Sequence, residues 1–470
     1  MNQKIIVDAQ ATTKKSQSGY PPNQALSKRL LWFWGSGLFA LTFLLHLSYG
    51  VWFHTKSPTD IPKTSISLVG EAYLASYPGW GAHEMDAASQ NRIATEIMRT
   101  GVPRTRSGAV SLHNPIYNYF LAASYWLGGV RLLSVAIPQA ILSGAIAVLV
   151  AFTTLRLAPQ PRVATLVIAG ALILGNEFLA ASTAYLAPVQ LLLFFYCIAL
   201  YAAAGSWRRG STMFIFVLAV VAAVYTQAAF FVVGVAAAIW LLLGCLRSKS
   251  KSQLLSGFAL ALLVASKLVL GVVRLDGVRE DSVRESDRGT LWIANNPYYE
   301  NTHLWERWRM RYGPEPRWNL SDEQLHRHDD YLARADGDLK KAGWLYLREN
   351  PGQYAKFSFI RMWSGILAPD GNRWQRQLIS FTNWLLILPA GLYALWRYRQ
   401  WEFSKLSVLI LLAELALLTF ILLFVRYRLP AEILLTIYAT IAYTELWAWW
   451  RGRRSHGNLP ASDSHREPTG

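Results

Sequence analysis

Cysteine is almost absent from this chain, which has two cysteines among its 470 residues. Both lie inside long apolar stretches, at Cys197 and Cys245, so we expect them to pack as small apolar residues. The sequence therefore offers neither a disulfide framework nor a cysteine-based metal site. It also lacks an internal repeat, a Walker phosphate-binding loop and a glycine-rich dinucleotide motif. These absences argue against a disulfide-rich secreted domain and against the usual nucleotide-binding enzymes.

Charged residues are also scarce, at 16% of the chain, whereas 53% of the residues are hydrophobic and 20 are Trp. This composition is more apolar than that of an ordinary soluble domain. Apolar runs of about 20 residues, the length that crosses a hydrocarbon core of about 30 Å, recur along the sequence. We predict an all-α polytopic membrane protein with ten spans. They lie near residues 30–53, 132–155, 163–182, 185–204, 211–226, 228–246, 254–273, 380–396, 406–425 and 431–449.

The net charge of +17 is distributed unevenly. Six segments predicted to share one side of the membrane carry +4, +2, +2, +3, +2 and +2, together +15, and these are residues 1–29, 156–162, 206–211, 247–253, 397–405 and 450–470. The two long polar loops, 54–115 and 274–378, each carry only +1. Cytoplasmic segments are enriched in Lys and Arg, so we place both termini in the cytoplasm and both loops on the outer face of the inner (plasma) membrane. Because topology explains the basic balance, no nucleic-acid partner is needed.

Five regions follow from this topology. Residues 1–29 and 451–470 are polar tails that we expect to be disordered. Residues 30–273 form a transmembrane core that includes the first outer loop, 54–115. Residues 274–378 form a second outer subdomain, and residues 379–450 contain the last transmembrane helices.

The outer loops have predicted structure of their own. The piece 115–129 is too short to span, and we expect a short amphipathic or re-entrant helix with Tyr117, Tyr119 and Tyr125 at headgroup depth. In the second loop, Ser321 to Gln324 fits a capping box, which predicts a helix running toward Ala335. Further helices are expected over residues 337–349, stopped by Asn-Pro, and from about residue 353 onward.

Several motifs occur in a set order on predicted sides of the membrane. They are DAASQNRIATEIMRTG (86–101), HNPIYNYFLAASYWLGG (113–129), RLLSVAIPQAIL (131–142), LWIANNPYY (291–299), KKAGWLYLRENPGQYAKFSFIRMW (340–363) and RYRLP (426–430). In this order they resemble the GT-C superfamily, whose members include protein O-mannosyltransferases and the lipid A aminoarabinose transferase. The resemblance implies a polytopic glycosyltransferase that takes a sugar from a polyprenyl-phosphate-linked donor on the outer face of the membrane. The acceptor, whether lipid, glycan or protein, is left open.

Two departures from that family pattern are visible. Many relatives carry adjacent Asp and Glu residues in the first loop, whereas here Met85 separates Glu84 from Asp86. Ala294 also replaces the glycine that opens the Gly-Asn-Asn-Pro segment, leaving Asn295 and Asn296 as the carried-over binding residues.

Transfer from such a donor requires a base that accepts the proton of the acceptor. The resemblance points to Asp86 as this base, with Glu84 as the other catalytic candidate. Alternatively, Asp86 caps the start of a helix that continues through Ile93 and Met98. A second carboxylate would orient the acceptor or hold a divalent cation, although no complete metal-ligand set is visible in the sequence.

The leaving phosphate calls for basic donors. The candidates are Arg104, Arg106, His113, Lys267, Arg274, Arg426 and Arg428. Lys267 lies inside the predicted membrane edge, where a charged group either lines a functional cavity or extends to the headgroups. The alternative for Arg426 and Arg428 is interfacial anchoring, and for His113 a structural hydrogen bond.

Two other classes of function remain open at this stage. One is an O-antigen ligase or polymerase that uses a diphosphate-linked glycan, although the carboxylates in the first loop argue against it. The other is a non-enzymatic lipid or glycan transporter, for which an acidic residue at the midplane would be expected. Glu414 is the one candidate for that residue, and its alternative is a polar packing contact between helices.

Overall fold

The computed structural model describes thirteen stretches of the chain, and the fold is given for these residues. They are residues 27–55, 81–104, 110, 114–159, 163–176, 179–180, 182–183, 188–205, 210–248, 251–272, 322–367, 374–420 and 428–457. Within them the regular structure is helical, apart from one isolated antiparallel bridge between Arg104 and Val110. The all-α class predicted from the sequence is therefore confirmed for the described residues.

The helices fall into three groups. The bundle consists of α2 (Lys28–Thr55), α6 (Leu132–Leu157), α7 (Val163–Leu174), α9 (Val189–Ala203), α10 (Gly210–Thr226), the short 3-10 helix η2 (Ala228–Phe230), α11 (Phe231–Ser248), α12 (Lys251–Val272), α18 (Trp374–Arg397), α19 (Glu402–Phe420) and α20 (Leu429–Gly457). A cap consists of α4 (Gly81–Thr100) and α5 (Pro115–Gly128). An outlying unit consists of α15 (Asp322–Arg334), α16 (Leu339–Glu349) and α17 (Pro351–Leu367).

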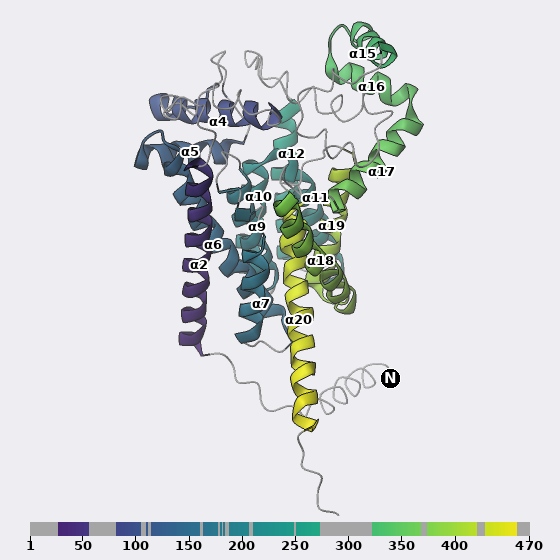
Figure 1. The fold of residues 1–470 in the computed structure, drawn as a ribbon. Helices are drawn as coiled ribbons and strands as arrows, with labels where there is room; N and C mark the ends of the chain where they lie inside the picture. Colours follow the sequence, from purple (N-terminus) through teal and green to yellow (C-terminus); the bar gives the residue numbers. More distant parts are fainter. Residues whose placement is uncertain are drawn as a thin grey trace, which may run out of the picture.

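The cap and the outlying unit lie at the same end of the bundle. Figure 1 shows α4 and α5 across that end, and α15 and α16 above it, with α17 leading down toward the bundle. The start of α2 and the end of α20 lie at the opposite end (Figure 1). We call these the loop end and the terminal end. The arrangement matches the predicted parity of the outer loops and the termini.

Each of the ten predicted spans contains a helix, but the lengths differ. Two helical stretches, Lys28–Val51 and Leu133–Leu157, are long and apolar enough to cross a membrane. Shorter apolar helices follow at Val163–Leu174, Val189–Ala203, Ser211–Thr226, Phe231–Leu246 and Trp384–Arg397. The span predicted at 163–182 departs most from expectation, because α7 ends at Leu174. Its end is fixed by Asn176, whose side-chain oxygen accepts the Leu179 N–H at 2.9 Å, a local bond that competes with helix continuation.

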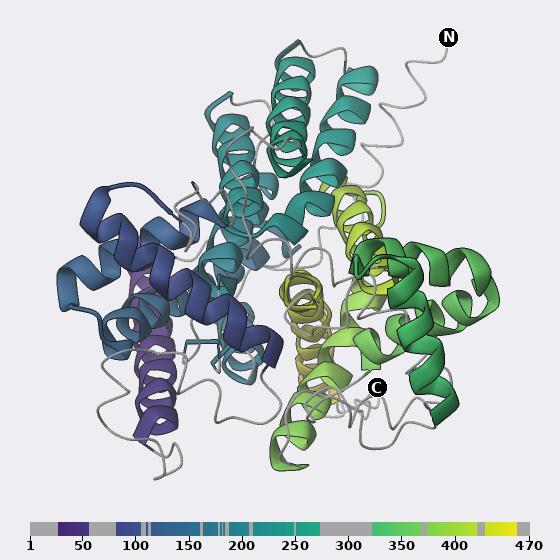
Figure 2. The same ribbon diagram turned by 90° about the horizontal axis from the view of Figure 1, so that it is seen from above.

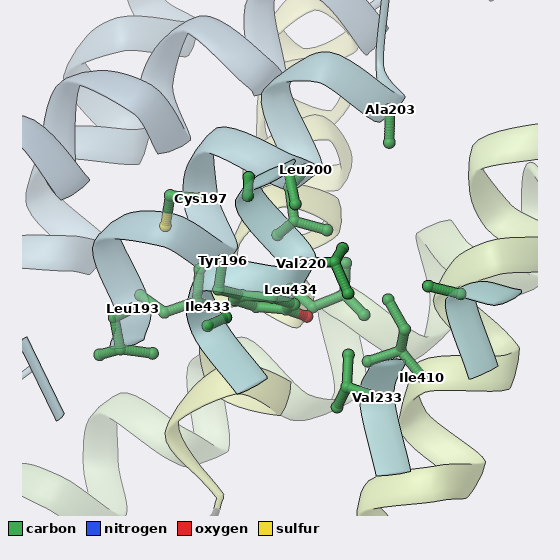
Figure 3. Packing of buried hydrophobic residues seen from close by; sticks show 14 of the residues in the cluster. Leu193, Tyr196, Cys197, Leu200, Ala203, Val220, Val233, Ile410, Ile433 and Leu434 are labelled. Carbon is green, nitrogen blue, oxygen red and sulfur yellow. The ribbon is translucent and has the colours of Figure 1, made fainter. Parts of the chain in front are cut away.

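The centre of the bundle is a close-packed apolar core. Side chains from α9, α10, α11, α19 and α20 meet around Tyr196, whose ring packs edge-on against Phe230 with centroids 5.4 Å apart (Figure 3). Figure 3 also shows Leu200, Val220 and Ile410 converging on this ring. Cys197 belongs to the same core and both cysteines are buried and free, as their apolar surroundings predicted.

The cap packs through one face of α4. Ile93, Ala94 and Ile97 are buried against Tyr117 and Leu121 of α5. Burial of an isoleucine side chain contributes about 1.5–3 kcal/mol, so these contacts hold α4 across the loop end. Asn114, at a left-handed φ of 46°, precedes α5, and Pro at its first turn supplies the fixed φ that helix starts favour.

The predicted short helix at 115–129 is confirmed as α5, and two of the three tyrosines that were predicted at headgroup depth are buried within the protein. Tyr117 and Tyr125 are each 1% exposed, whereas Tyr119 is 47% exposed. The two buried rings face α4 and α6 instead of lipid headgroups, because the apolar face of α4 covers them. The Tyr125 hydroxyl donates to Asn91 of α4 at 2.8 Å, which satisfies its buried polar end.

The three helices predicted in the second loop are present as α15, α16 and α17. α17 begins at Pro351, two residues earlier than predicted, since proline is well tolerated at the first helical position. Tyr331, Tyr346 and Phe357 form a small apolar core between the three helices. The Arg334 guanidinium pairs with Glu349 and so joins α15 to the end of α16. The capping serine Ser321 lies outside the described residues.

Candidate functional site

The predicted base, Asp86, lies inside α4 and not at its start. The helix begins at Gly81, so residue 86 is not an N-cap, and that alternative is wrong. Position 86 precedes the buried residues Gln90, Ile93 and Ile97 by four, seven and eleven residues. On a helix of 3.6 residues per turn, these positions share one face. The backbone register therefore places residue 86 on the stripe that the later turns of α4 bury against α5.

The second catalytic candidate, Glu84, falls on the opposite face by the same register. It precedes the exposed Thr95 by eleven residues, the spacing that returns a helix to the same side. The side chains of Glu84 and Asp86 themselves are not described. The helix register distinguishes the two carboxylates, which the sequence motif alone did not.

The first turns of α4 extend past α5. In Figure 1 they reach toward the side of the bundle where α12 lies, and in Figure 2 they point from the periphery toward the middle of the molecule. Gln90, one turn after position 86, is 2% exposed, and its side-chain oxygen has no hydrogen-bond partner among the described residues. A buried polar acceptor of this kind costs about 1–3 kcal/mol unless a ligand or water satisfies it. The inward face of α4 is thus polar before residue 93 and apolar after it.

Lys267 lies in α12 near the loop end and is 9% exposed. Its ammonium group lies 5.3 Å from the centre of the Tyr225 ring of α10, within the range of a cation–π contact. The Tyr225 hydroxyl is 2.8 Å from Ser266, the residue before Lys267. The side chain is therefore held against α10. Of the two alternatives open from sequence, burial favours the internal position over extension to the headgroups.

Among the predicted phosphate ligands that the structure describes, Arg428 is the most deeply buried, at 3% exposed. Its Nε donates to Glu432 at 2.6 Å, one turn along α20, and its guanidinium lies 5.0 Å from the centre of the Trp384 ring of α18. Interfacial anchoring, the alternative for this residue, is wrong, because the side chain lies between helices. A carboxylate already neutralises the guanidinium in this structure.

The partner of that pair connects it to the irregular segment after α7. Asn176 donates from its side-chain nitrogen to the second Glu432 oxygen at 2.9 Å. Gln190 of α9 donates to the Leu179 carbonyl and to the Ser182 hydroxyl, both at 2.6 Å. Thr183 in turn donates to the His46 carbonyl of α2 at 3.1 Å. We call this chain of contacts the buried polar network, and it joins α2, α9, α18 and α20.

Arg428 is the member of this network that sequence reasoning singled out. It missed the residues that contact the Arg428–Glu432 pair, Asn176 and Trp384, as well as Glu432 itself and the polar residues His46, Ser182, Thr183 and Gln190. Arg428 and Glu432 are four residues apart, and residues at this spacing are neighbours on one face of a helix. The sequence could therefore have predicted this ion pair. Nothing local could pair Asn176 with Glu432, since 256 residues separate them.

The remaining predicted ligands are not brought together by the described structure. Arg104 is exposed and forms the isolated bridge with Val110. It lies near Glu96, whose pKa is lowered by a hydrogen bond from Arg99 and by the charges of Arg99 and Arg104. The other six predicted ligands lie outside the described residues, and they are Arg106, His113, Arg274, Asn295, Asn296 and Arg426.

Glu414 of α19 is 2% exposed, and it lines a narrow, mostly apolar cavity with Gln227, Phe230 and Pro430. Residues of α11, α19 and α20, and Gln227 directly after α10, meet around it, but neither side-chain oxygen of Glu414 has a hydrogen-bond partner among the described residues, so a polar packing contact stays a prediction. Among the described residues, no three His, Cys, Asp or Glu side chains gather in a group that could hold a metal ion. The described part of the chain gives the possible divalent cation no built site, and no step below uses one.

No protein-family model and no curated protein matches the sequence. Solved structures do show similarity. The archaeal oligosaccharyltransferase AglB from Archaeoglobus fulgidus, in complex with an inhibitory peptide and a dolichol-phosphate, matches 93% of this chain and 53% of its own, at 14% identity and a TM-score of 0.47. ArnT from Cupriavidus metallidurans bound to undecaprenyl phosphate matches 85% of this chain and 80% of its own, at 11% identity and a TM-score of 0.34.

The apo state of the same ArnT matches 80% of this chain and 76% of its own, at 14% identity and a TM-score of 0.31. These neighbours are GT-C glycosyltransferases, the superfamily that the sequence motifs resemble. The chain spans about half the length of AglB. With TM-scores below 0.5, the likenesses assign neither substrate nor acceptor to this chain.

Proposed function

We propose that this protein is an inverting membrane glycosyltransferase. It moves a sugar from a polyprenyl-phosphate-linked donor to a lipid, glycan or protein acceptor on the outer face of the membrane. The observation that carries the proposal is the placement of α4. This helix lies across the loop end of an apolar bundle, and its inward stripe runs through position 86 and Gln90.

The buried cations supply the second support. Lys267 lies in the last two turns of α12, and Arg428 directly precedes the start of α20. Both are largely removed from solvent. A phosphate entering this region from the bilayer meets basic groups in a low-dielectric setting, where charge-assisted hydrogen bonds are strong.

The proposed reaction is a single displacement. The acceptor oxygen attacks the anomeric carbon while the Asp86 carboxylate takes the acceptor proton. The bond from the anomeric carbon to the phosphate oxygen breaks, and the polyprenyl phosphate leaves with its electron pair. Basic side chains stabilise the charge that develops on the phosphate. Attack opposite the leaving group inverts the anomeric configuration.

The helical register of α4 predicts that Asp86 and Glu84 contribute differently to turnover. Purified protein in lipid nanodiscs is incubated with radiolabelled polyprenyl-phosphate sugars and an envelope extract as acceptor, and donor consumption is measured. Asp86→Asn is expected to reduce turnover by about two to four orders of magnitude, the usual contribution of a positioned base. Glu84→Gln, on the outward face of α4, is expected to retain most of it.

Two results would count against the proposal in different ways. Full turnover by Asp86→Asn would remove the base and leave the reaction class standing. No consumption of any polyprenyl-phosphate sugar by the parent protein, under conditions in which it is folded, would remove the reaction class itself.

A further inference from the structure

The last helix of the bundle extends beyond the helix it packs against. α20 has 29 residues, which at about 1.5 Å per residue gives a length of roughly 43 Å, more than the roughly 30 Å of a hydrocarbon core. Glu445 ties it to the end of α18, since it pairs with Arg397 and accepts a hydrogen bond from the Tyr398 hydroxyl. Beyond that tie the helix continues from residue 446 to residue 457. Figure 1 shows this part extending past the other helices at the terminal end.

The extension has a composition unlike the rest of the helix. Residues 446–457 read LWAWWRGRRSHG, with three Trp, three Arg and no acidic residue. The Trp447 and Trp450 rings lie 5.5 Å apart, and the Arg451 guanidinium lies 4.9 Å from the centre of the Trp447 ring. Both rings remain partly accessible, at 39% and 38% exposed. Arginine over an aromatic face is held in place while its N–H donors stay available.

A second pair of the same kind lies at the end of α18. The Arg399 guanidinium lies 5.1 Å from the centre of the Trp396 ring, and it also donates to the Trp396 carbonyl at 3.2 Å. Trp396 is 64% exposed. We call these five residues, Trp396, Arg399, Trp447, Trp450 and Arg451, the basic–aromatic collar.

The acidic residues near the collar already have other partners. Glu445 pairs with Arg397, and Glu402 pairs with Lys405. The described partners of Arg399 and Arg451 are Trp rings, so their positive charge is not neutralised by those acids. The preference for positive charge on the cytoplasmic side requires only the charge of these residues. Here two arginines from separate helices also each stack on a Trp ring that is partly exposed, which is a geometry suited to binding. Trp rings prefer headgroup depth, and arginine forks bind phosphate bidentately.

We propose that the basic–aromatic collar is a binding site for anionic phospholipid headgroups in the leaflet at the terminal end. Each guanidinium would take a headgroup phosphate while stacked on its own Trp ring, with the rings at the level of the glycerol backbone. Charge complementarity and continuity with the predicted span at 431–449 favour a lipid over a soluble polyanion. The inference does not depend on the proposed transferase activity.

The test uses the full chain purified in detergent and reconstituted into nanodiscs of phosphatidylcholine alone or mixed with phosphatidylglycerol. Native mass spectrometry measures which lipids remain bound, and thermal unfolding is followed in both nanodiscs. The parent protein is expected to retain phosphatidylglycerol several-fold over phosphatidylcholine and to unfold at a higher temperature in the mixed lipid. The double variant Arg399→Gln/Arg451→Gln is expected to lose both effects.

Two controls keep the outcome interpretable. Arg348→Gln removes an exposed arginine at the loop end and is expected to change neither effect. Arg399→Lys/Arg451→Lys keeps the charge but loses the planar fork, and is expected to retain part of the preference. No lipid preference in the parent, or an unchanged preference in a folded Gln double variant, would overturn the proposal. So would displacement of phosphatidylglycerol by soluble polyphosphate, because the collar would then be a site for a soluble polyanion.

Discussion

Arg428 and Glu432 show how one buried residue depends on another. Their side chains are 3% and 7% exposed, so each charge has lost its water and relies on the other. Removing one partner of such a pair leaves an uncompensated buried charge, which typically costs about 3–5 kcal/mol. The pair therefore stabilises the fold, and Arg428 is also a candidate to bind an anionic ligand.

Glu432→Gln is expected to lower the free energy of unfolding by about that amount, because Arg428 keeps its charge and loses its carboxylate. Thermal unfolding in nanodiscs measures the change. Arg428→Met/Glu432→Gln removes both charges and is expected to recover most of the loss. If the double variant is no more stable than Glu432→Gln, the energetic dependence of the two residues is disproved.

Donor binding offers a second measurement on the same pair. Phosphate competes with Glu432 for the Arg428 guanidinium, so among variants that stay folded Glu432→Gln is expected to bind a polyprenyl-phosphate donor more tightly than the parent. Asn176→Ala removes the other contact of Glu432 and serves as a milder control. Unchanged or weaker donor binding by Glu432→Gln would show that Arg428 has only a structural role.

Residues with a local signal could be singled out from the sequence. The place of Lys267 in an apolar stretch left burial and extension to the headgroups as alternatives, and the structure shows it buried. The role of position 86 rests on a motif and stays a prediction. The Asn176–Glu432 contact has no local signal, since it exists only after α7 and α20 pack together. The same holds for Tyr117 and Tyr125, whose burial requires α4 to lie over them.

At the scale of single elements, an ion pair joins two helices of the outlying unit. Arg334 and Glu349 join α15 to α16, and the Tyr331 hydroxyl also donates to Glu349 at 2.9 Å. The hydrogen bond from Arg334 is the main cause that lowers the pKa of Glu349 below its ordinary value. Because the pKa is lowered on folding, this contact stabilises the unit above the ordinary glutamate pKa of about 4.3. That stabilisation disappears as the pH falls through the lowered pKa of the folded state.

Amide hydrogen exchange of α15 and α16 at neutral and acidic pH tests this linkage. Exchange is expected to accelerate below about pH 4, beyond the intrinsic change in exchange rate, as Glu349 becomes protonated. The effect should be modest, since both side chains are partly exposed and solvent screens the pair. Glu349→Gln is expected to show fast exchange at both pH values. An acid-induced change of the same size in Glu349→Gln would assign it to other groups.

The presence of the helices could be predicted because short stretches of sequence indicate where each one lies. Apolar runs marked the bundle helices, Asn-Pro separated α16 from α17, and Pro115 and Gly129 bounded α5. Helix ends were less predictable where a side chain competes with the backbone. The predicted span at 163–182 stops early because Asn176 caps a turn, and an isolated asparagine in an apolar run gives little warning of this.

For the whole molecule, charge placement predicted topology without any coordinates. One contact in the described structure is consistent with it: Arg156 at the end of α6 donates to the Tyr201 carbonyl near the end of α9. The helix end that precedes the predicted cytoplasmic segment 206–211 therefore lies beside the end of α6. α16 lies at the loop end (Figure 1). Ten spans then put residues 206 and 340 on opposite sides of the membrane.

Cysteine accessibility tests this in the full chain. Both native cysteines are buried, so an impermeant maleimide should give little background labelling. In sealed vesicles with their outer face exposed, Lys340→Cys is expected to react at once, whereas Ser206→Cys should react only after permeabilisation. Equal reactivity before permeabilisation would put both residues on one side and so reject the ten-span topology. The cap, and with it position 86, would then no longer be constrained to the outer face on which the proposed transfer depends.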